Sequence, residues 1–334
     1  MTRNRNHIFF TYIHLVLFTF LCFLSACKTN QKSSSYISLG NEYARDGLLR
    51  EAVESYKKSI ARHPKNLTAF RNLGMVLVKL GNYKDATRYL GKALERYNKN
   101  FSTNFYLGEA YRALENYADA IYYYQNSLKI RRNDSHTLKA LSWSYFKIRY
   151  YSEALTTARK LYKIEPKDSQ AAIIIARTLL KLKRYTEALK IVRRAKDDSE
   201  KHELPYLHSV EGDITFETGD IQRAKKLYKL AIKGQPLLAG ALLGLGKCLY
   251  EQKRTKLAIT YMERALRIRP LLTETHLLLG KAYEKINLRK SISHYQNFRK
   301  KASTDPEYLS LLSDIKKRIS LLRRSRKKIR KKRS

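Results

Sequence analysis

Small residues recur along this chain at an interval of 34 residues, with one step of 36. The series is Gly40, Gly74, Gly108, Ser142, Ala176, Gly212, Gly246 and Gly280. An alanine lies twelve residues after each of the first seven, at Ala52, Ala86, Ala120, Ala154, Ala188, Ala224 and Ala258. A fixed period of this length predicts an array of repeated units, each of which buries its faces against its neighbours.

Tyrosines and prolines keep the same period. Several tyrosines lie three residues after the small residue: Tyr43, Tyr111, Tyr145 and Tyr283. Prolines lie 24 residues after it, at Pro64, Pro166, Pro236 and Pro270. This spacing resembles the signature of the tetratricopeptide repeat (TPR) family over residues 33 to about 300. The resemblance implies an all-α fold, a right-handed α-solenoid of about eight helix pairs, whose members we call helices A and B.

The period also sets boundaries. We expect the array at residues 36–304, with repeats beginning near residues 33, 67, 101, 135, 169, 205, 239 and 273. A small residue at each step lets helices A and B approach closely, aromatic rings fill the space between repeats, and proline ends helix B. Repeat 5 lacks the glycine and the tyrosine, and polar residues 197–203 lengthen its exit. Either a change of curvature or a hinge there fits this departure.

The amino terminus has the features of an export signal. Arg3 and Arg5 precede an apolar run over residues 8–24, and small residues follow before Cys27. The residues Leu24-Ser25-Ala26-Cys27 resemble the bacterial lipobox. The resemblance implies that residues 1–26 are removed and that Cys27 is acylated, with residues 27–35 as a polar tether. The length of the apolar run leaves an uncleaved membrane anchor open as the alternative.

These features predict a lipid-anchored location in a bacterial cell envelope. Lys28 follows the cysteine, and no acidic residue occurs before Glu42. By the rule known from enteric bacteria, this resembles an outer-membrane address. The alternative location is the inner membrane, through the uncleaved anchor.

The carboxyl terminus predicts a capping helix over residues 305–322 and a basic tail over residues 323–334. Asp305 is the expected helix cap, and an apolar stripe is formed by Tyr308, Leu312, Ile315, Ile319 and Leu322. Twelve of the eighteen residues from Lys316 to Arg333 are basic. They are the predicted contacts to an anionic surface: Lys316, Lys317, Arg318, Arg323, Arg324, Arg326, Lys327, Lys328, Arg330, Lys331, Lys332 and Arg333.

The formal net charge of +39 favours an anionic partner, because charge so far from zero repels itself. Each cation close to an anionic membrane contributes about 1 kcal/mol of attraction. Anionic lipids, anionic polymers and acidic proteins are candidates, and a solvated tail with no single partner is the alternative. Nucleic acid is a poorer candidate, because charge is its only supporting signal.

TPR arrays resemble one another in binding extended peptides or partner helices in a groove lined by helices A. The groove candidates here are Asn41, Arg45, Arg71, Lys79, Arg112, Lys139, Trp143, Phe146, Lys147, Arg177, Lys181 and Lys247. Trp143 either holds a ligand group or packs between helices. The two-carboxylate clamp of some TPR proteins is not predicted, because Ile37, Ser102 and Tyr106 occupy its three cationic places.

The sequence carries no pattern that indicates catalysis. The eight histidines show no metal-ligand spacing, and neither a phosphate-binding glycine loop nor a serine nucleophile motif occurs. We therefore expect no enzyme activity, no metal and no cofactor. The sequence predicts a membrane-anchored scaffold that binds an envelope protein or peptide. The alternative is a binder of anionic polymers or membrane surfaces through its charge.

Overall fold

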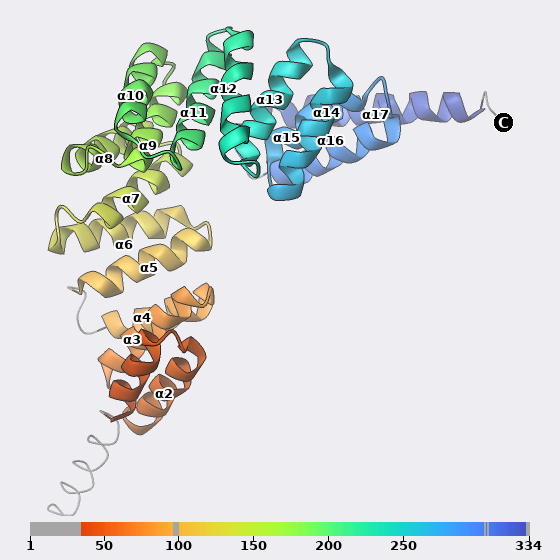
Figure 1. Ribbon diagram of the computed structural model, residues 1–334. Helices are drawn as coiled ribbons and strands as arrows, with labels where there is room; N and C mark the ends of the chain where they lie inside the picture. The colour runs from red at the N-terminus through yellow and green to blue at the C-terminus, as the bar shows by residue number, and fades with distance from the viewer. Residues whose placement is uncertain (1–34, 96–99, 304, 306, 332–334) are drawn as a thin grey trace, which may run out of the picture. The chain divides into compact units, whose positions relative to one another are not determined.

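The computed structural model describes residues 35–95, 100–303, 305 and 307–331, the side chains of residues 330 and 331 excepted. All regular secondary structure in these residues is α-helical (Figure 1). This confirms the predicted all-α fold. The predicted signal peptide, lipobox and tether up to residue 34 lie outside the described residues.

The chain divides into two compact units, one ending at Ile164 and the other beginning at Glu165. In the first, a helical segment at residues 35–45 is followed by α2 (Leu49–Arg62), α3 (Leu67–Lys79), α4 (Tyr83–Leu94), α5 (Phe101–Ala113), α6 (Tyr117–Ile130), α7 (Ser135–Lys147) and α8 (Tyr151–Ile164).

The second unit holds nine helices in the residues described: α9 (Ser169–Lys181), α10 (Tyr185–Asp198), α11 (Leu204–Glu217), α12 (Ile221–Gly234), α13 (Ala239–Glu251), α14 (Thr255–Ile268), α15 (Thr273–Tyr283), α16 (Leu288–Ala302) and α17 (Leu309–Lys331).

From α2 to α16, odd-numbered helices are the helices A of the repeats and even-numbered helices are the helices B. Within each unit, each helix A packs on its own helix B and on the next helix A, as α11 does on α12 and α13. The described residues form eight such pairs, the first of them made by residues 35–45 and α2. Helix α17 follows them and packs on α16.

Two kinds of turn join the helices: one leads from helix B to the next helix A, and the other leads from helix A to helix B. Before several helices A, an Asn or Asp side chain accepts backbone N–H groups of the first turn, as Asn66 does from Thr68 and Ala69. The turn from helix A to helix B contains a residue of positive φ in each of the first seven repeats, and glycine supplies it in three of them. Elsewhere a lysine, arginine or glutamate holds it, for example Lys253 at φ 60°.

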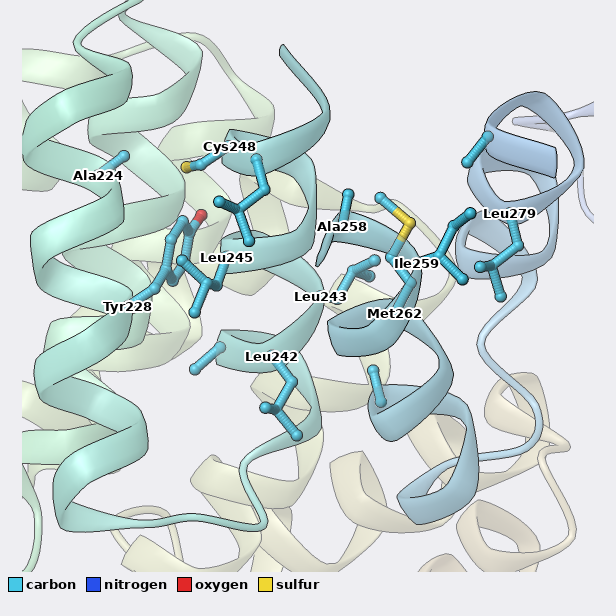
Figure 2. Close-up of a cluster of buried hydrophobic side chains, with 14 of the residues drawn as sticks. Ala224, Tyr228, Leu242, Leu243, Leu245, Cys248, Ala258, Ile259, Met262 and Leu279 are labelled. Carbon is cyan, nitrogen blue, oxygen red and sulfur yellow. The ribbon is translucent and has the colours of Figure 1, made fainter. Parts of the chain in front are cut away.

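Close approach of helices A and B explains the periodic glycines. A Cβ atom added at Gly212 would lie 2.8 Å from the ring of Tyr228, which is 1% exposed. Tyr228 also meets Gly244 of the next repeat. Figure 2 shows its ring directed from α12 toward Leu245 and Cys248 of α13. Both predictions, close packing at the small residues and aromatic filling between repeats, are confirmed at this position.

The predicted division of the carboxyl terminus differs from the structure. One helix, α17, covers both the expected capping helix and most of the expected tail, and Figure 1 shows it extending past α15 and α16. Asp305 does not cap it. Its carboxylate accepts the N–H of Glu307 at 3.0 Å, in a turn before the helix. The burial of Ile315, Ile319 and Leu322 stabilises the first part of the helix, and the Lys and Arg residues that follow have a high helix propensity.

The apolar stripe of α17 packs as predicted. Ile315, Ile319 and Leu322 are buried against α15 and α16, in a cluster that includes Phe298, with Tyr308 and Leu312 at its margin. No helix in the described part of the chain is both long enough and apolar enough to span a bilayer.

Candidate protein-binding faces on helices A

One position of each repeat defines a shared face of helices A, which we call the A face. It is the residue directly after the small residue of the 34-residue series. In chain order its residues are Asn41, Met75, Glu109, Trp143, Arg177, Asp213, Lys247 and Lys281. Since helix A of one repeat contacts helix A of the next within each unit, these side chains form one row in each unit.

In three repeats, the hydroxyl of a tyrosine on helix B donates a hydrogen bond to the A-face residue. The hydroxyl of Tyr56 donates to Asn41 Oδ1 at 2.8 Å, and that of Tyr228 donates to Asp213 Oδ1 at 2.8 Å. The hydroxyl of Tyr124 donates to Glu109 in the same way.

The other repeats of the first seven carry no hydroxyl at the tyrosine position, which holds Leu90, Ala158, Val192 and Met262. Their A-face residues are Met75, Trp143, Arg177 and Lys247, none of which is a carboxylate or an amide. Among the first seven repeats, a carboxylate or amide on the A face therefore occurs only where helix B carries the tyrosine. The sequence alone did not suggest this pairing.

The amino-terminal end of the first unit is polar. Asn72 donates to Asn41 Oδ1 at 2.9 Å, and Arg71 Nε donates to Asn72 Oδ1 at 3.3 Å. Arg45 and Lys79, two further predicted groove residues, are exposed on helices A of these repeats. The structure thus brings Asn41 and Arg71 into one hydrogen-bonded chain.

In the third repeat, Arg112 pairs with Glu109 through nitrogen–oxygen distances of 3.2 and 2.6 Å. Burial and the adjacent Glu109 carboxylate raise the pKa of Tyr124 well above its usual value. Tyr124 is therefore a hydrogen-bond donor at neutral pH, and Arg112 is a paired cation on this face.

An aromatic cluster marks the fourth repeat. The rings of Trp143 and Phe146 stack with centroids 5.3 Å apart, and Lys147 Nζ lies 5.5 Å from the centre of the Trp143 ring. Phe146 also contacts Tyr151 at 5.8 Å. Trp143 and Phe146 are partly exposed, as is Lys139 on the same helix, while Lys147 is exposed. The structure brings all four predicted residues onto α7.

In the second unit, three A-face charges, Arg177, Asp213 and Lys247, interact with other charges of the chain. Lys247 Nζ lies 3.0 Å from a Glu274 oxygen and 4.8 Å from the centre of the Phe216 ring. Burial lowers the pKa of Arg177, and Asp213 opposes that effect. Burial raises the pKa of Asp213, against the attraction of Arg177 and the Tyr228 hydrogen bond. The row therefore alternates in sign from Arg177 through Asp213 to Lys247, and Lys281 ends it with a second cation.

Lys181, a predicted groove residue on α9, also has a partner. Its Nζ lies 3.2 Å from a carboxylate oxygen of Glu307, in the turn before α17. Both side chains are more than 40% exposed, so the pair contributes little to stability. Their contact places the segment before α17 beside the A face of α9.

Two buried polar groups were not predicted. Glu211 on α11 is 2% exposed and accepts from Lys196 at 2.8 Å and from Arg223 at 3.1 Å. Burial would raise the pKa of Glu211, but the hydrogen bonds and charges of these two cations outweigh burial and lower it. Glu211 therefore connects Lys196 of repeat 5 with Arg223 of repeat 6. The one feature of the sequence that could have indicated this buried carboxylate is its position next to Gly212.

The second group is a histidine pair. His276 Nδ1 and His294 Nδ1 lie 3.1 Å apart, between α15 and α16. Burial, followed by the nearby His294 and Lys301, lowers the pKa of His276 to about 4. No group of three or more His, Cys, Asp or Glu in the described residues is placed to hold a metal ion.

The cations of α17 fall into two groups. Arg318 Nε donates to Glu284 at 2.9 Å, and Lys317 lies 4.0 Å from Asp314. The remaining described cations are exposed: Lys316, Arg323, Arg324, Arg326, Lys327 and Lys328. The side chains of Arg330 and Lys331 and the residues Lys332 and Arg333 lie outside the described part, as does Cys27.

The sequence matches the family described as tetratricopeptide repeat over residues 37–86, 72–135 and 210–272. Residues 147–211 match the family described as anaphase-promoting complex, cyclosome, subunit 3. No curated protein matches this chain in sequence.

The fold is similar to several solved structures. One is a tetratricopeptide repeat protein from Parabacteroides merdae (TM-score 0.66, 19% identity, 75% of this chain and 99% of that chain). Another is yeast Tom70 (TM-score 0.61, 16% identity, 88% of this chain and 65% of that chain). A third is the APC/C hetero-tetramer Cut9–Hcn1 (TM-score 0.58, 14% identity, 80% of this chain and 52% of that chain). The chain thus contains tetratricopeptide repeats and has the fold of a TPR solenoid.

Proposed function

We propose that this protein is an exported, lipid-anchored scaffold that binds a protein or peptide of a bacterial cell envelope on its A face. The TPR fold supports the protein-binding part of the proposal. Among similar folds, that of the Cut9–Hcn1 hetero-tetramer belongs to a protein assembly. The observation that carries the proposal is the cluster of Trp143, Phe146 and Lys147, which is stacked and still solvent-accessible on α7.

The chemistry of this cluster indicates the kind of ligand. A partly exposed tryptophan offers a large apolar contact with little side-chain entropy to lose, and such residues dominate binding energy at interfaces. Lys139 and Lys147 beside it favour a carboxylate or another anionic group on the partner. We therefore expect a peptide or helix that carries an aromatic or apolar anchor next to an acidic side chain.

A pull-down from detergent-solubilised envelopes tests this site. The full chain is compared with Trp143→Ala/Lys147→Ala and with the control Tyr122→Ala, which removes a 58% exposed aromatic from helix B α6. The partner should be captured by the full chain and the control, and lost from the double variant. Equal capture by all three would count against the A face.

The lipid anchor rests on the lipobox resemblance of residues Leu24 to Cys27. Two acyl chains give stable membrane attachment, whereas one gives marginal binding. If Cys27 is the anchor, Cys27→Ala should leave the precursor uncleaved, so that the protein keeps residues 1–26 and incorporates no labelled fatty acid. Unchanged mature size and unchanged fatty-acid labelling would contradict lipidation.

A second candidate function has its own observation. The exposed cations Arg323, Arg324, Arg326, Lys327 and Lys328 lie on the extended part of α17. Such a helix could bind an anionic polymer or membrane surface, and that binding would weaken steeply with added salt. Deleting residues 316–334 without loss of envelope binding would exclude it as the main contact.

A further inference from the structure

Two neighbouring turns of the second unit expose leucines in an unusual way. Leu237 follows Pro236 after α12, and Leu271 follows Pro270 after α14. Their exposed fractions are 68% and 76%, the highest of the exposed large apolar residues in the part of the chain described. Because the two turns occupy the same place in consecutive repeats, the leucines recur on one edge of the unit.

Other repeats carry polar residues at this place. Lys65 and Lys167 follow the prolines of repeats 1 and 4, where the next residue is Asn66 or Asp168. Those two side chains accept backbone N–H groups and cap the following helix A.

In the two leucine turns, Leu238 and Leu272 take the capping position, and no side chain caps α13 or α15. Both turns therefore lose a helix cap and expose an apolar side chain. Leu238 and Leu272 pack against the buried cluster of α12 to α15, so the fold explains their place at the cap position. Leu237 and Leu271 gain no such burial, and contact with another surface explains them better.

The charges beside these leucines select the kind of surface. No acidic residue occurs from Ile221 to Tyr250, or from Arg264 to Thr273. Exposed cations flank both turns: Lys229, Lys233, Arg267 and Arg269. Lys301 of α16 reaches the same edge, since its Nζ donates to the carbonyl of Pro270.

We propose that this edge, the turns at residues 235–238 and 269–272, contacts an anionic phospholipid bilayer. Leu237 and Leu271 enter the boundary between headgroups and acyl chains, and the flanking cations bind headgroup phosphates. Apolar tips surrounded by cations suit that boundary, which is apolar on one side and anionic on the other. The site is separate from the cations of α17 and does not depend on acylation of Cys27.

Single-cysteine labelling of the full chain tests the proposal. The background is Cys22→Ser/Cys27→Ser, because Cys248 is buried and burial raises the pKa of its thiol to about 11. Leu237→Cys and Leu271→Cys carry a polarity-sensitive fluorophore, and Lys65→Cys and Lys167→Cys are matched controls from equivalent turns. The chains are reconstituted into vesicles of phosphatidylethanolamine and phosphatidylglycerol that contain brominated lipid.

Labels at positions 237 and 271 should shift to the blue and be quenched by the brominated lipid, whereas labels at 65 and 167 should not. Replacing phosphatidylglycerol by phosphatidylcholine should reduce the quenching several-fold. Equal quenching at all four positions, or none at 237 and 271, would overturn the proposal. A blue shift without lipid quenching would also overturn it, and would indicate a protein contact.

A second variant tests whether the two leucine turns contact the same surface. Leu271→Lys restores the residue type of repeats 1 and 4 at an exposed position and should leave the thermal unfolding temperature unchanged. It should weaken the bilayer contact of the label at position 237 about tenfold, the effect expected for one leucine removed from the bilayer. Unchanged quenching at position 237 would show that the two turns do not share a surface.

Discussion

The hydroxyl of Tyr228 donates a hydrogen bond of 2.8 Å to Asp213, fifteen residues earlier in the chain. The ring of this tyrosine lies against Gly212 of its own repeat and Gly244 of the next. One side chain thus joins helices A and B, contacts the following repeat and orients a carboxylate of the A face. The same fifteen-residue relationship joins Tyr56 to Asn41 and Tyr124 to Glu109.

Removing this hydroxyl should destabilise the second unit. Tyr228→Phe keeps the ring but leaves Asp213, a partly buried carboxylate, without its donor. We expect the free energy of unfolding to fall by about 1–3 kcal/mol in urea denaturation. The exposed Tyr122→Phe should change it by less than about 0.5 kcal/mol. Equal effects of the two changes would contradict a specific role for the Tyr228 hydroxyl.

The close approach of helices A and B predicts opposite effects for two glycines. At Gly108, an added Cβ would lie 2.5 Å from Tyr124, so Gly108→Ala should cost about 1–3 kcal/mol of stability. At Gly91, within α4, an added Cβ would meet nothing within 4 Å. Gly91→Ala should therefore stabilise the protein by about 0.5–1 kcal/mol. Thermal unfolding compares the two, and destabilisation by both would contradict the packing argument.

The tyrosine and its acceptor should also be energetically coupled. Repeat 2 replaces both, with Met75 and Leu90. Introducing the same pair in repeat 3, as Glu109→Met/Tyr124→Leu, should cost less than the sum of the single changes by about 1–2 kcal/mol. A double-mutant cycle in urea measures this difference. Additive effects would show that the two positions vary independently.

The sequence predicted the fold well because its signals are local and periodic. The glycines and alanines mark where helices A and B approach, and the packing at Gly212 and Tyr228 agrees. The contacts of the A-face side chains were harder to predict from the sequence. The contact of Lys181 with Glu307 joins residues 126 apart, and no pattern of the 34-residue period encodes it.

The length of α17 was missed for a different reason. A run of Lys and Arg has no apolar period beyond Leu322, so the sequence predicted a separate tail. In the structure the buried stripe up to Leu322 holds the first part of the helix, and the rest continues from it. The tyrosine–acceptor pairing was also not predicted: its fifteen-residue spacing recurs in three repeats, but a spacing does not show which side chains of helices A and B meet.

The histidine pair predicts a loss of stability in acid. Burial and neighbouring cations lower the pKa of His276 to about 4 and also lower that of His294, from the ordinary value of 6.5. Because the unfolded chain binds these protons more readily, the stability of the neutral pair is complete above about pH 6.5 and is lost as pH falls toward about 4.

Urea denaturation at about pH 7.5 and about pH 5 checks this, with an expected loss of about 1–3 kcal/mol from the pair. His294→Gln separates this loss from the titration of carboxylates, because it removes one member of the pair. The variant should lose less stability than the wild type over the same interval. Equal losses in the two proteins would rule out the histidines as the cause.

The central claim, that the A face holds an envelope protein, is tested most directly by photocrosslinking in intact cells. A benzophenone amino acid replaces Trp143 on α7 in one strain and Tyr122 on the opposite helix of the neighbouring repeat in another. The account predicts a discrete crosslinked envelope protein at position 143 and none at position 122. No crosslink at 143, or the same crosslinks at both positions, would contradict it.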